Sequence, residues 1–287
     1  MRRTFTGPAE FLADPGNRAR VGEYLADMAR PYGLDVPAAL LRDPPSPALG
    51  HSYGEMAEAL IGPAVPPDEP VDLLILAFSI HDLRPGRQTA AYLSHVTPGA
   101  PMAFAICDQG PAAAFSALRV AREYASSGGI RRALLIVVEQ AALPYACPVT
   151  VPSQHRGIAM VYGSTGAGGC GGSPPRGSTA GARVACVRQH PDVPPGAAAG
   201  LAAATLAELA AGHPEVGLVL GDALAAEWTA PAAARVRVMP PGQPSTAVWW
   251  GLIDELTGDA GHPDLLVAAD YDPGLRYLSL TAFDAGP

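Results

Sequence analysis

The chain has 287 residues, and its 27 acidic residues outnumber 19 basic ones, all of them arginine, so the net charge is −8. Such a chain lacks the basic patch that nucleic-acid binding needs, and no window approaches the ~20 apolar residues of a membrane span. The four cysteines are far apart, without a C-x-x-C motif, and the N-terminus has no hydrophobic signal region. We therefore expect a cytoplasmic protein, without a metal centre or cofactor, that binds neither nucleic acid nor membranes.

Residues 1–50 form an N-terminal extension that is polar and rich in proline, for which we expect short helices and loops. A more regular order begins at Ser52, a residue suited to cap a short helix that ends near Ile61. The near-continuous apolar run at residues 71–78 follows, and it is typical of a strand buried on both faces.

A second strand, a long helix and two further strands complete an N-terminal half over residues 51–163. These elements are expected at residues 102–106, 111–127, 132–138 and 157–162. Pro111 suits the first turn of the long helix, and Gly128 suits its end.

Residues 164–182 consist almost entirely of Gly, Ser, Thr, Pro and Ala, and we interpret them as a flexible connection. They contain a G-x-G-x-x-G pattern at 166–171, but prolines follow where a dinucleotide site needs a helix, so this pattern reflects loop composition.

The C-terminal half, residues 183–287, repeats the alternation of strands and helices. Strands are expected at 183–188, 216–220, 235–239, 265–269 and 275–283, and helices at 198–211 and 245–256. The strands at 216–220 and 235–239 are expected to be buried. This order predicts a layered α/β protein that is built from two copies of one unit.

Three segments keep a distinctive order along the chain. Residues 103–110 lead into the first long helix, residues 242–247 (GQPSTA) lead into the last helix, and residues 264–269 (DLLVAA) form a late strand. In this order they resemble the thiolase superfamily, and within it the ketosynthase III-like and HMG-CoA synthase-like condensing enzymes, over about residues 52–284. The resemblance implies a single thiolase-like domain with a duplicated, five-layered α-β-α-β-α architecture that forms a homodimer.

In that family a cysteine at the N-terminus of a buried helix accepts the acyl group from CoA or an acyl carrier protein, and a His and an Asn complete the site. The resemblance places the cysteine on Cys107, in a C-x-x-G turn that ends at Gly110, and the Asn on Gln243. Counting back from Gly128 at the family's spacing gives Pro111 instead. Proline has no nucleophilic group, so either the helix is one turn longer here or Cys107 lies one turn upstream of the usual position. Cys107 then either faces the pocket as the nucleophile or is a small buried residue at the end of a strand.

The family's His falls on Gly221 or Asp222, so the Cys-His-Asn set is incomplete. Asp108 either caps the long helix or acts as a carboxylate in place of the missing His, and its charge would raise the pKa of the neighbouring thiol. The glycine-rich turn of the family is reduced to a single turn that contains Gly274.

His81 and Asp82 follow the first buried strand, at the edge where α/β sheets bind ligands. Asp82 either pairs with Arg84 or Arg87 in a solvated loop or serves the pocket as a base. The expected catalytic residues are Cys107, Asp108 and Gln243, and the expected substrate-binding residues are Gly110, His81, Asp222 and Gly274.

Two classes of function fit these residues. The first is a divergent ketosynthase III-like enzyme that transfers or condenses acyl groups in polyketide or fatty-acid-like specialised metabolism, with Cys107 as nucleophile and Gln243 as amide donor. The second is a catalytically silent subunit that is similar to the chain-length factors and forms a heterodimer with an active ketosynthase. Between them lies a repurposed site that carries out non-condensing chemistry on an acyl thioester through Asp108.

Overall fold

The computed structural model describes residues 2–5, 15–35, 51–82, 88–141, 143, 150–163, 182–258 and 261–284. Several features singled out in the sequence lie outside these ranges. They are Arg84, Arg87, Cys147, Cys170, the glycine-rich pattern at 166–171 and all but the last residue of the 164–182 connection.

The strands of the first half form one five-stranded sheet in the order β1-β5-β4-β2-β3. In this sheet β2 lies parallel to β3 and β4, whereas β5 lies antiparallel to β4 and β1. The elements of this half are β1 (Arg2–Phe5), α1 (Pro15–Ala29), the 3-10 helix η2 (Arg30–Tyr32), α2 (Tyr53–Ala64), β2 (Leu73–Ala77), α3 (Thr89–Val96), β3 (Met102–Ile106), α4 (Ala112–Ser126), β4 (Arg132–Glu139) and β5 (Arg156–Gly163).

The second half forms a second five-stranded sheet, in the order β6-β10-β9-β7-β8. Here β7 lies parallel to β8 and β9, whereas β10 lies antiparallel to β9 and β6, so each strand has a counterpart in the first sheet. The elements are β6 (Arg183–His190), α5 (Ala198–Leu209), β7 (Val216–Leu220), α6 (Asp222–Glu227), β8 (Arg235–Val238), α7 (Ala247–Thr257), β9 (Leu265–Asp272) and β10 (Tyr277–Asp284). The two sheets therefore repeat one topology, as the order of elements in the sequence predicts.

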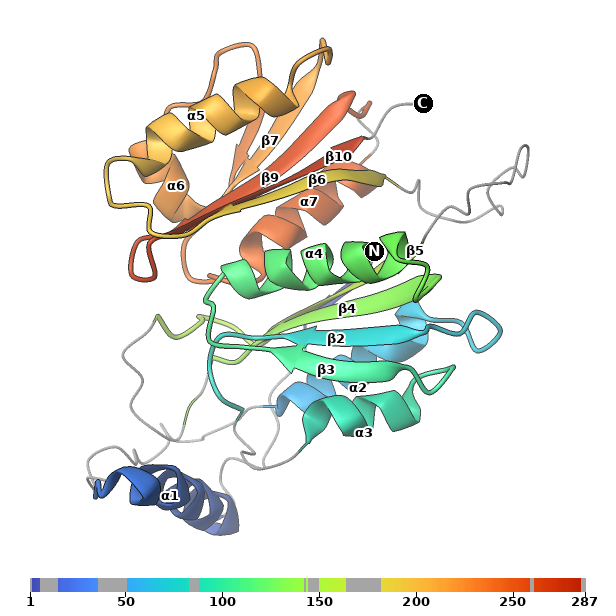
Figure 1. Cartoon of the computed structure of the whole chain (residues 1–287), viewed down its shortest axis with the longest axis vertical. Helices are drawn as coiled ribbons and strands as arrows, with labels where there is room; N and C mark the ends of the chain where they lie inside the picture. The colour runs from blue at the N-terminus through green and yellow to red at the C-terminus, as the bar shows by residue number, and fades with distance from the viewer. Residues whose placement is uncertain are drawn as a thin grey trace.

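The helices and sheets are stacked in five layers (Figure 1). Helices α2 and α3 cover the outer face of the first sheet, α4 and α7 lie between the sheets, and α5 and α6 cover the outer face of the second. The central layer is held by large apolar side chains, since the ring centroids of Phe115 on α4 and Trp249 on α7 are 4.8 Å apart. The predicted five-layered α-β-α-β-α fold is confirmed.

The predicted helix after Ser52 is present and ends in Ala64, one turn beyond the expected end. Ser52 and Glu55 form a reciprocal capping box, in which each side chain accepts a hydrogen bond from the other residue's backbone N–H. Pro63 is tolerated inside the last turn. The long helix α4 also matches its prediction, with Pro111 as its N-cap and the left-handed Gly128 just beyond its end.

The prediction of a buried strand at 235–239 is wrong, because every residue of β8 is exposed. This strand lies at the edge of the second sheet and pairs only with β7. Its arginines form ion pairs with Glu255 on α7, while Val238 on the same strand is 54% exposed.

Two helices were not expected from the sequence, α3 and α6, which are only 8 and 6 residues long. No helix in the described ranges is long and apolar enough to cross a bilayer.

Candidate functional site

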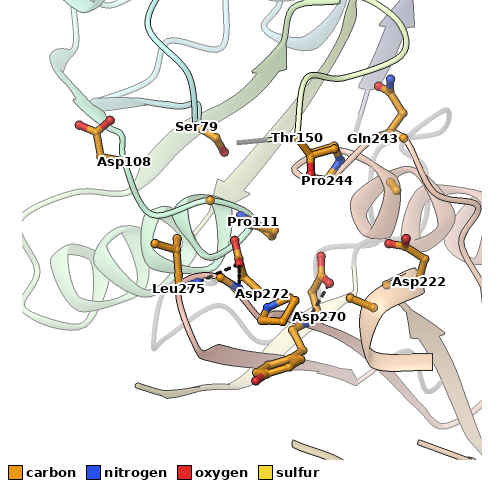
Figure 2. A pocket seen from close by; sticks show the side chains of 18 residues that line it. Ser79, Asp108, Pro111, Thr150, Asp222, Gln243, Pro244, Asp270, Asp272 and Leu275 are labelled. Carbon is orange, nitrogen blue, oxygen red and sulfur yellow. Dashed lines mark hydrogen bonds between the residues drawn. The ribbon is translucent and has the colours of Figure 1, made fainter. Parts of the chain in front are cut away.

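The N-terminal ends of α4, α6 and α7 meet the turn between β9 and β10 around a cavity of about 590 Å³ (Figure 2). Both halves of the chain contribute to its wall. The polar side chains among its lining residues are Ser79, Asp108, Thr150, Asp222, Gln243, Asp270, Tyr271 and Asp272. The cavity therefore lies where helix N-termini from the two halves come together.

The approach to α4 brings Asp108, Gly110 and Pro111 to the cavity, whereas Cys107 is not among the lining residues. Asp108 and Gly110 both have positive φ angles, of 61° and 52°, and this tight turn leads directly into Pro111 at the N-cap. At the start of α4 the cavity is thus lined by a proline, which has no nucleophilic atom, and not by the thiol of Cys107.

The thiol of Cys107 donates a hydrogen bond to Oδ2 of Asp108 at 3.1 Å. Partial burial, this hydrogen bond and the charge of Asp108 together raise the pKa of the Cys107 thiol to about 11. Because the thiolate is the nucleophilic form, Cys107 is a weak nucleophile at neutral pH. The sequence-based expectation that Asp108 raises the pKa of this thiol agrees with the geometry.

Asp270, at the end of β9, was not among the predicted site residues. Its side chain is buried, and its Oδ1 accepts a hydrogen bond from the backbone N–H of Tyr271 at 2.8 Å. Burial raises its pKa well above the ordinary range, and the charges of Asp222, Asp272 and Glu139 raise it further. Gly221 makes this placement possible, since a Cβ there would overlap the Asp270 carboxyl group.

Asp272 fixes the turn between β9 and β10. Its Oδ1 accepts hydrogen bonds from the backbone N–H groups of Gly274 and Leu275, at 2.8 and 3.0 Å. Its Oδ2 lies against the backbone of Gly110, where a Cβ would not fit. Gly274 therefore lines the cavity as part of a turn whose shape depends on Asp272.

Gln243 lines the cavity, but its amide group is engaged elsewhere. Its Nε2 donates to Oγ of Ser153 at 3.1 Å and to the carbonyl oxygen of Gln154 at 3.2 Å. Both amide hydrogens are thus used to hold the segment before β5. In this conformation Gln243 offers a thioester no free N–H donor.

A buried carboxyl group from the first half supports the first turn of α7. Glu139, at the end of β4, accepts hydrogen bonds from the backbone N–H of Ser245 and the hydroxyl of Thr246. Burial raises the pKa of Glu139 to about 7, although these hydrogen bonds and the charge of Arg156 lower it. The only signal for this residue in the sequence is an acid that directly follows an apolar strand.

His81 and Asp82 lie outside the cavity wall. The ring of His81 is in edge contact with that of Tyr24 on α1, with 6.1 Å between their centroids. Asp82 accepts hydrogen bonds from the backbone N–H of Tyr53 at 3.2 Å and from Nε2 of Gln140 at 2.8 Å. These contacts hold Asp82 at the start of α2.

In the ranges that the structure describes, no three acidic, His or Cys side chains are grouped so that they could hold a metal ion. The cavity instead collects Asp108, Asp222, Asp270 and Asp272, and no arginine or histidine is found among its described lining residues. The chemistry available there is that of carboxyl groups, which can exchange protons or bind a cation.

No protein-family model and no curated protein matches the chain. Solved structures do resemble it. The tetronic acid condensing enzyme AbyA1 has a TM-score of 0.61 at 18% identity, over 82% of this chain and 86% of that one. The β-ketoacyl-[acyl carrier protein] synthase III of Thermus thermophilus has a TM-score of 0.56 at 15% identity, over 81% and 83%. OleA of Xanthomonas campestris has a TM-score of 0.55 at 13% identity, over 99% and 95%. The chain thus has the fold of the thiolase superfamily, to which ketosynthase III and these condensing enzymes belong.

Proposed function

We propose that the chain handles acyl thioesters of CoA or an acyl carrier protein in specialised metabolism of the polyketide or fatty-acid type, and that it does so without an acyl-cysteine intermediate. One observation carries this proposal: Pro111 and Asp108 line the cavity at the start of α4, whereas the thiol of Cys107 lies outside the lining and has a raised pKa. The site is then a repurposed one, in a cytoplasmic protein.

The reaction that suits such a site is cleavage of the thioester by water. Asp108 accepts a proton from a water molecule as its oxygen attacks the carbonyl carbon of the thioester. The C–S bond breaks, the proton passes to the departing thiolate, and a carboxylic acid and a free thiol result.

The test incubates the protein with panels of acyl-CoA and acyl-carrier-protein thioesters and measures free thiol release and intact protein mass. We expect no mass adduct, a rate that stays within about threefold in Cys107→Ala, and a loss of about a hundredfold or more in Asp108→Asn. Glu208→Gln, which removes a carboxylate from the exposed side of α5, serves as the matched control and keeps the wild-type rate.

An acyl adduct that disappears in Cys107→Ala would contradict the proposal and favour a condensing or acyl-transfer enzyme with Cys107 as nucleophile. Absence of any thioester turnover or binding would contradict acyl-thioester chemistry altogether.

A silent subunit in a heterodimer with an active ketosynthase is the second candidate, and an exposed sheet edge favours it. Strand β3 pairs only with β2, and Met102 on this strand is 48% exposed. An edge strand with unpaired backbone groups is a ready surface for another chain, whether a second copy or a ketosynthase. Co-expression with a ketosynthase encoded nearby tests this: a stable heterodimer whose activity is unchanged by Asp108→Asn would favour the silent subunit.

A further inference from the structure

Four carboxyl groups share the cavity without a balancing cation. Asp108, Asp222, Asp270 and Asp272 line it, the sequence contains no lysine, and no arginine or histidine is among the described lining residues. Burial raises the pKa of Asp270, and three acidic neighbours, including Glu139 behind the wall, raise it further. Such a concentration of like charge is unfavourable by itself, and a bound cation would relieve it.

Asp270 is the group in this set that most clearly points to a ligand. Its side chain is only 7% exposed, and one carboxyl oxygen is bonded to the N–H of Tyr271. The carboxyl group extends into the cavity on the side of Asp222 (Figure 2), and in the described part of the chain no donor is bonded to its second oxygen. The absence of a side chain at Gly221 leaves the room that this carboxyl group occupies. Asp270 is thus a buried carboxyl group with one oxygen hydrogen-bonded to the backbone and the other oxygen facing the cavity.

The geometry favours an organic cation over a metal ion. An all-protein site for Ca²⁺ or Zn²⁺ brings several ligands to one point, and among the described residues no three acidic, His or Cys side chains are grouped in this way. A protonated amine needs less, since its three N–H donors can each reach a separate carboxylate. By the same reasoning, an acyl group that ends in a carboxylate, such as malonyl, is repelled from this cavity.

We propose that the cavity selects an acyl thioester whose acyl chain ends in a protonated amine, with Asp270 and Asp222 binding the ammonium group. This inference rests on the proposed function, because it names the class of acyl group that the same cavity accepts. Asp108, at the start of α4, remains available for the thioester carbonyl carbon and its attacking water.

Three pantetheine thioesters of nearly equal size test the inference, because pantetheine is the arm common to CoA and carrier proteins. The β-alanyl thioester ends in an ammonium group, the butyryl thioester replaces it with a methyl group, and the succinyl thioester replaces it with a carboxylate. Calorimetry should show at least about tenfold tighter binding of the β-alanyl thioester than of the butyryl thioester, and weakest binding of the succinyl thioester.

Substitutions in the cavity show which residues cause the tighter binding of the β-alanyl thioester. In Asp270→Asn and Asp222→Asn, the β-alanyl thioester should lose its advantage over the butyryl thioester to within about threefold. In Glu208→Gln, which removes the same charge from the exposed side of α5, the advantage should be unchanged. Melting temperature and circular dichroism of each variant confirm that it is folded, and Asp222→Asn alone decides the question if Asp270→Asn is not.

Each other outcome identifies what has failed. If butyryl binds as tightly as β-alanyl, or if the preference survives both substitutions, the amine proposal is overturned while acyl-thioester handling stands. If Mg²⁺ alone binds in a manner that requires Asp270 and removes the amine preference, the site is a metal site and the inference is wrong. If none of the three thioesters binds, the proposed function itself has failed.

Discussion

Helices α4 and α7 occupy equivalent places in the two halves of the chain, yet their first turns are built differently. The start of α4 has Pro111 as N-cap and no side-chain cap. At the start of α7, the backbone N–H of Ser245 and the hydroxyl of Thr246 donate hydrogen bonds to Glu139 of the other half. The duplicated topology therefore fixes where the two helix ends lie, whereas single side chains decide what chemistry each end carries.

The largest effect should come from breaking the layer that the two helices share. Trp249→Ala removes a fully buried ring that packs on Phe115, and we expect a loss of about 3–5 kcal/mol in the free energy of unfolding. Trp250, the neighbouring residue, is only half-buried and stacks under Arg156 at 4.5 Å, so Trp250→Ala should cost about 1–2 kcal/mol. Denaturant unfolding measures both, and equal losses would argue against a shared central layer.

The second prediction concerns the pH dependence that Glu139 confers on the start of α7. Its pKa is about 7 in the folded protein against an ordinary value of 4.5, so the unfolded chain releases this proton first. The Glu139 contribution to the free energy of unfolding should therefore fall by roughly 3 kcal/mol as the pH rises through this window. Asp270, whose pKa is also raised, should add a fall of the same sign. Glu139→Gln should remove the Glu139 contribution and leave that of Asp270, whereas Glu208→Gln on the exposed face of α5 should keep both. An unchanged slope in Glu139→Gln would show that another group titrates.

The start of α4 should be more sensitive to backbone change than the interior of α5. Gly110 has a φ of 52° and lies against Asp272, so Gly110→Ala should cost about 2 kcal/mol in the free energy of unfolding. Gly200 lies inside α5 with nothing near its missing Cβ, so Gly200→Ala should instead gain about 0.5–1 kcal/mol. The opposite signs are the expected result in thermal or denaturant unfolding, and a loss at both positions would contradict it.

The smallest predicted change in stability concerns the N-caps of the outer helices α2 and α5, one from each half of the chain. Helix α2 begins with a complete capping box, whereas α5 begins at Ala197 with no side-chain cap. Ser52→Ala should therefore destabilise the protein by about 1 kcal/mol. Ala197→Ser offers α5 the cap that it lacks and should stabilise it by a smaller amount. Hydrogen exchange of the first turn of each helix separates these local effects from global ones.

Most of the fold could be predicted from the sequence because its central strands are continuous apolar runs. The inner strand β7 begins and ends where the sequence indicated, and so does the edge strand β3. The edge strand β8 was misjudged, because alternating Arg and Val residues do not reveal whether a helix or another strand covers them. The short helices α3 and α6 were missed, since one or two turns give too few residues for a periodic pattern.

The candidate site could be predicted only in part. Asp108, Gly110, Asp222, Gln243 and Gly274 do line one cavity, although they come from four separate segments. The placement of Cys107 could not be deduced, because it depends on the turn that Asp108 and Gly110 make through positive φ angles. Asp270 was overlooked because the apolar run before it suggested that the strand ends at Ala269, whereas β9 continues to Asp272 and carries the carboxyl group inside.

The hydrogen bonds between Glu139 and the first turn of α7 also affect how the protein folds while it is being synthesised. The two bonded pairs are separated by 106 and 107 residues along the chain, and α4 packs against strands β6 and β10, which are synthesised after it. A nascent chain that has only completed β5 therefore leaves one side of α4 and the Glu139 carboxyl group in water. The central layer can be buried completely only after the C-terminal half of the chain has been synthesised. Until then the chain exposes an apolar surface that chaperones and proteases recognise.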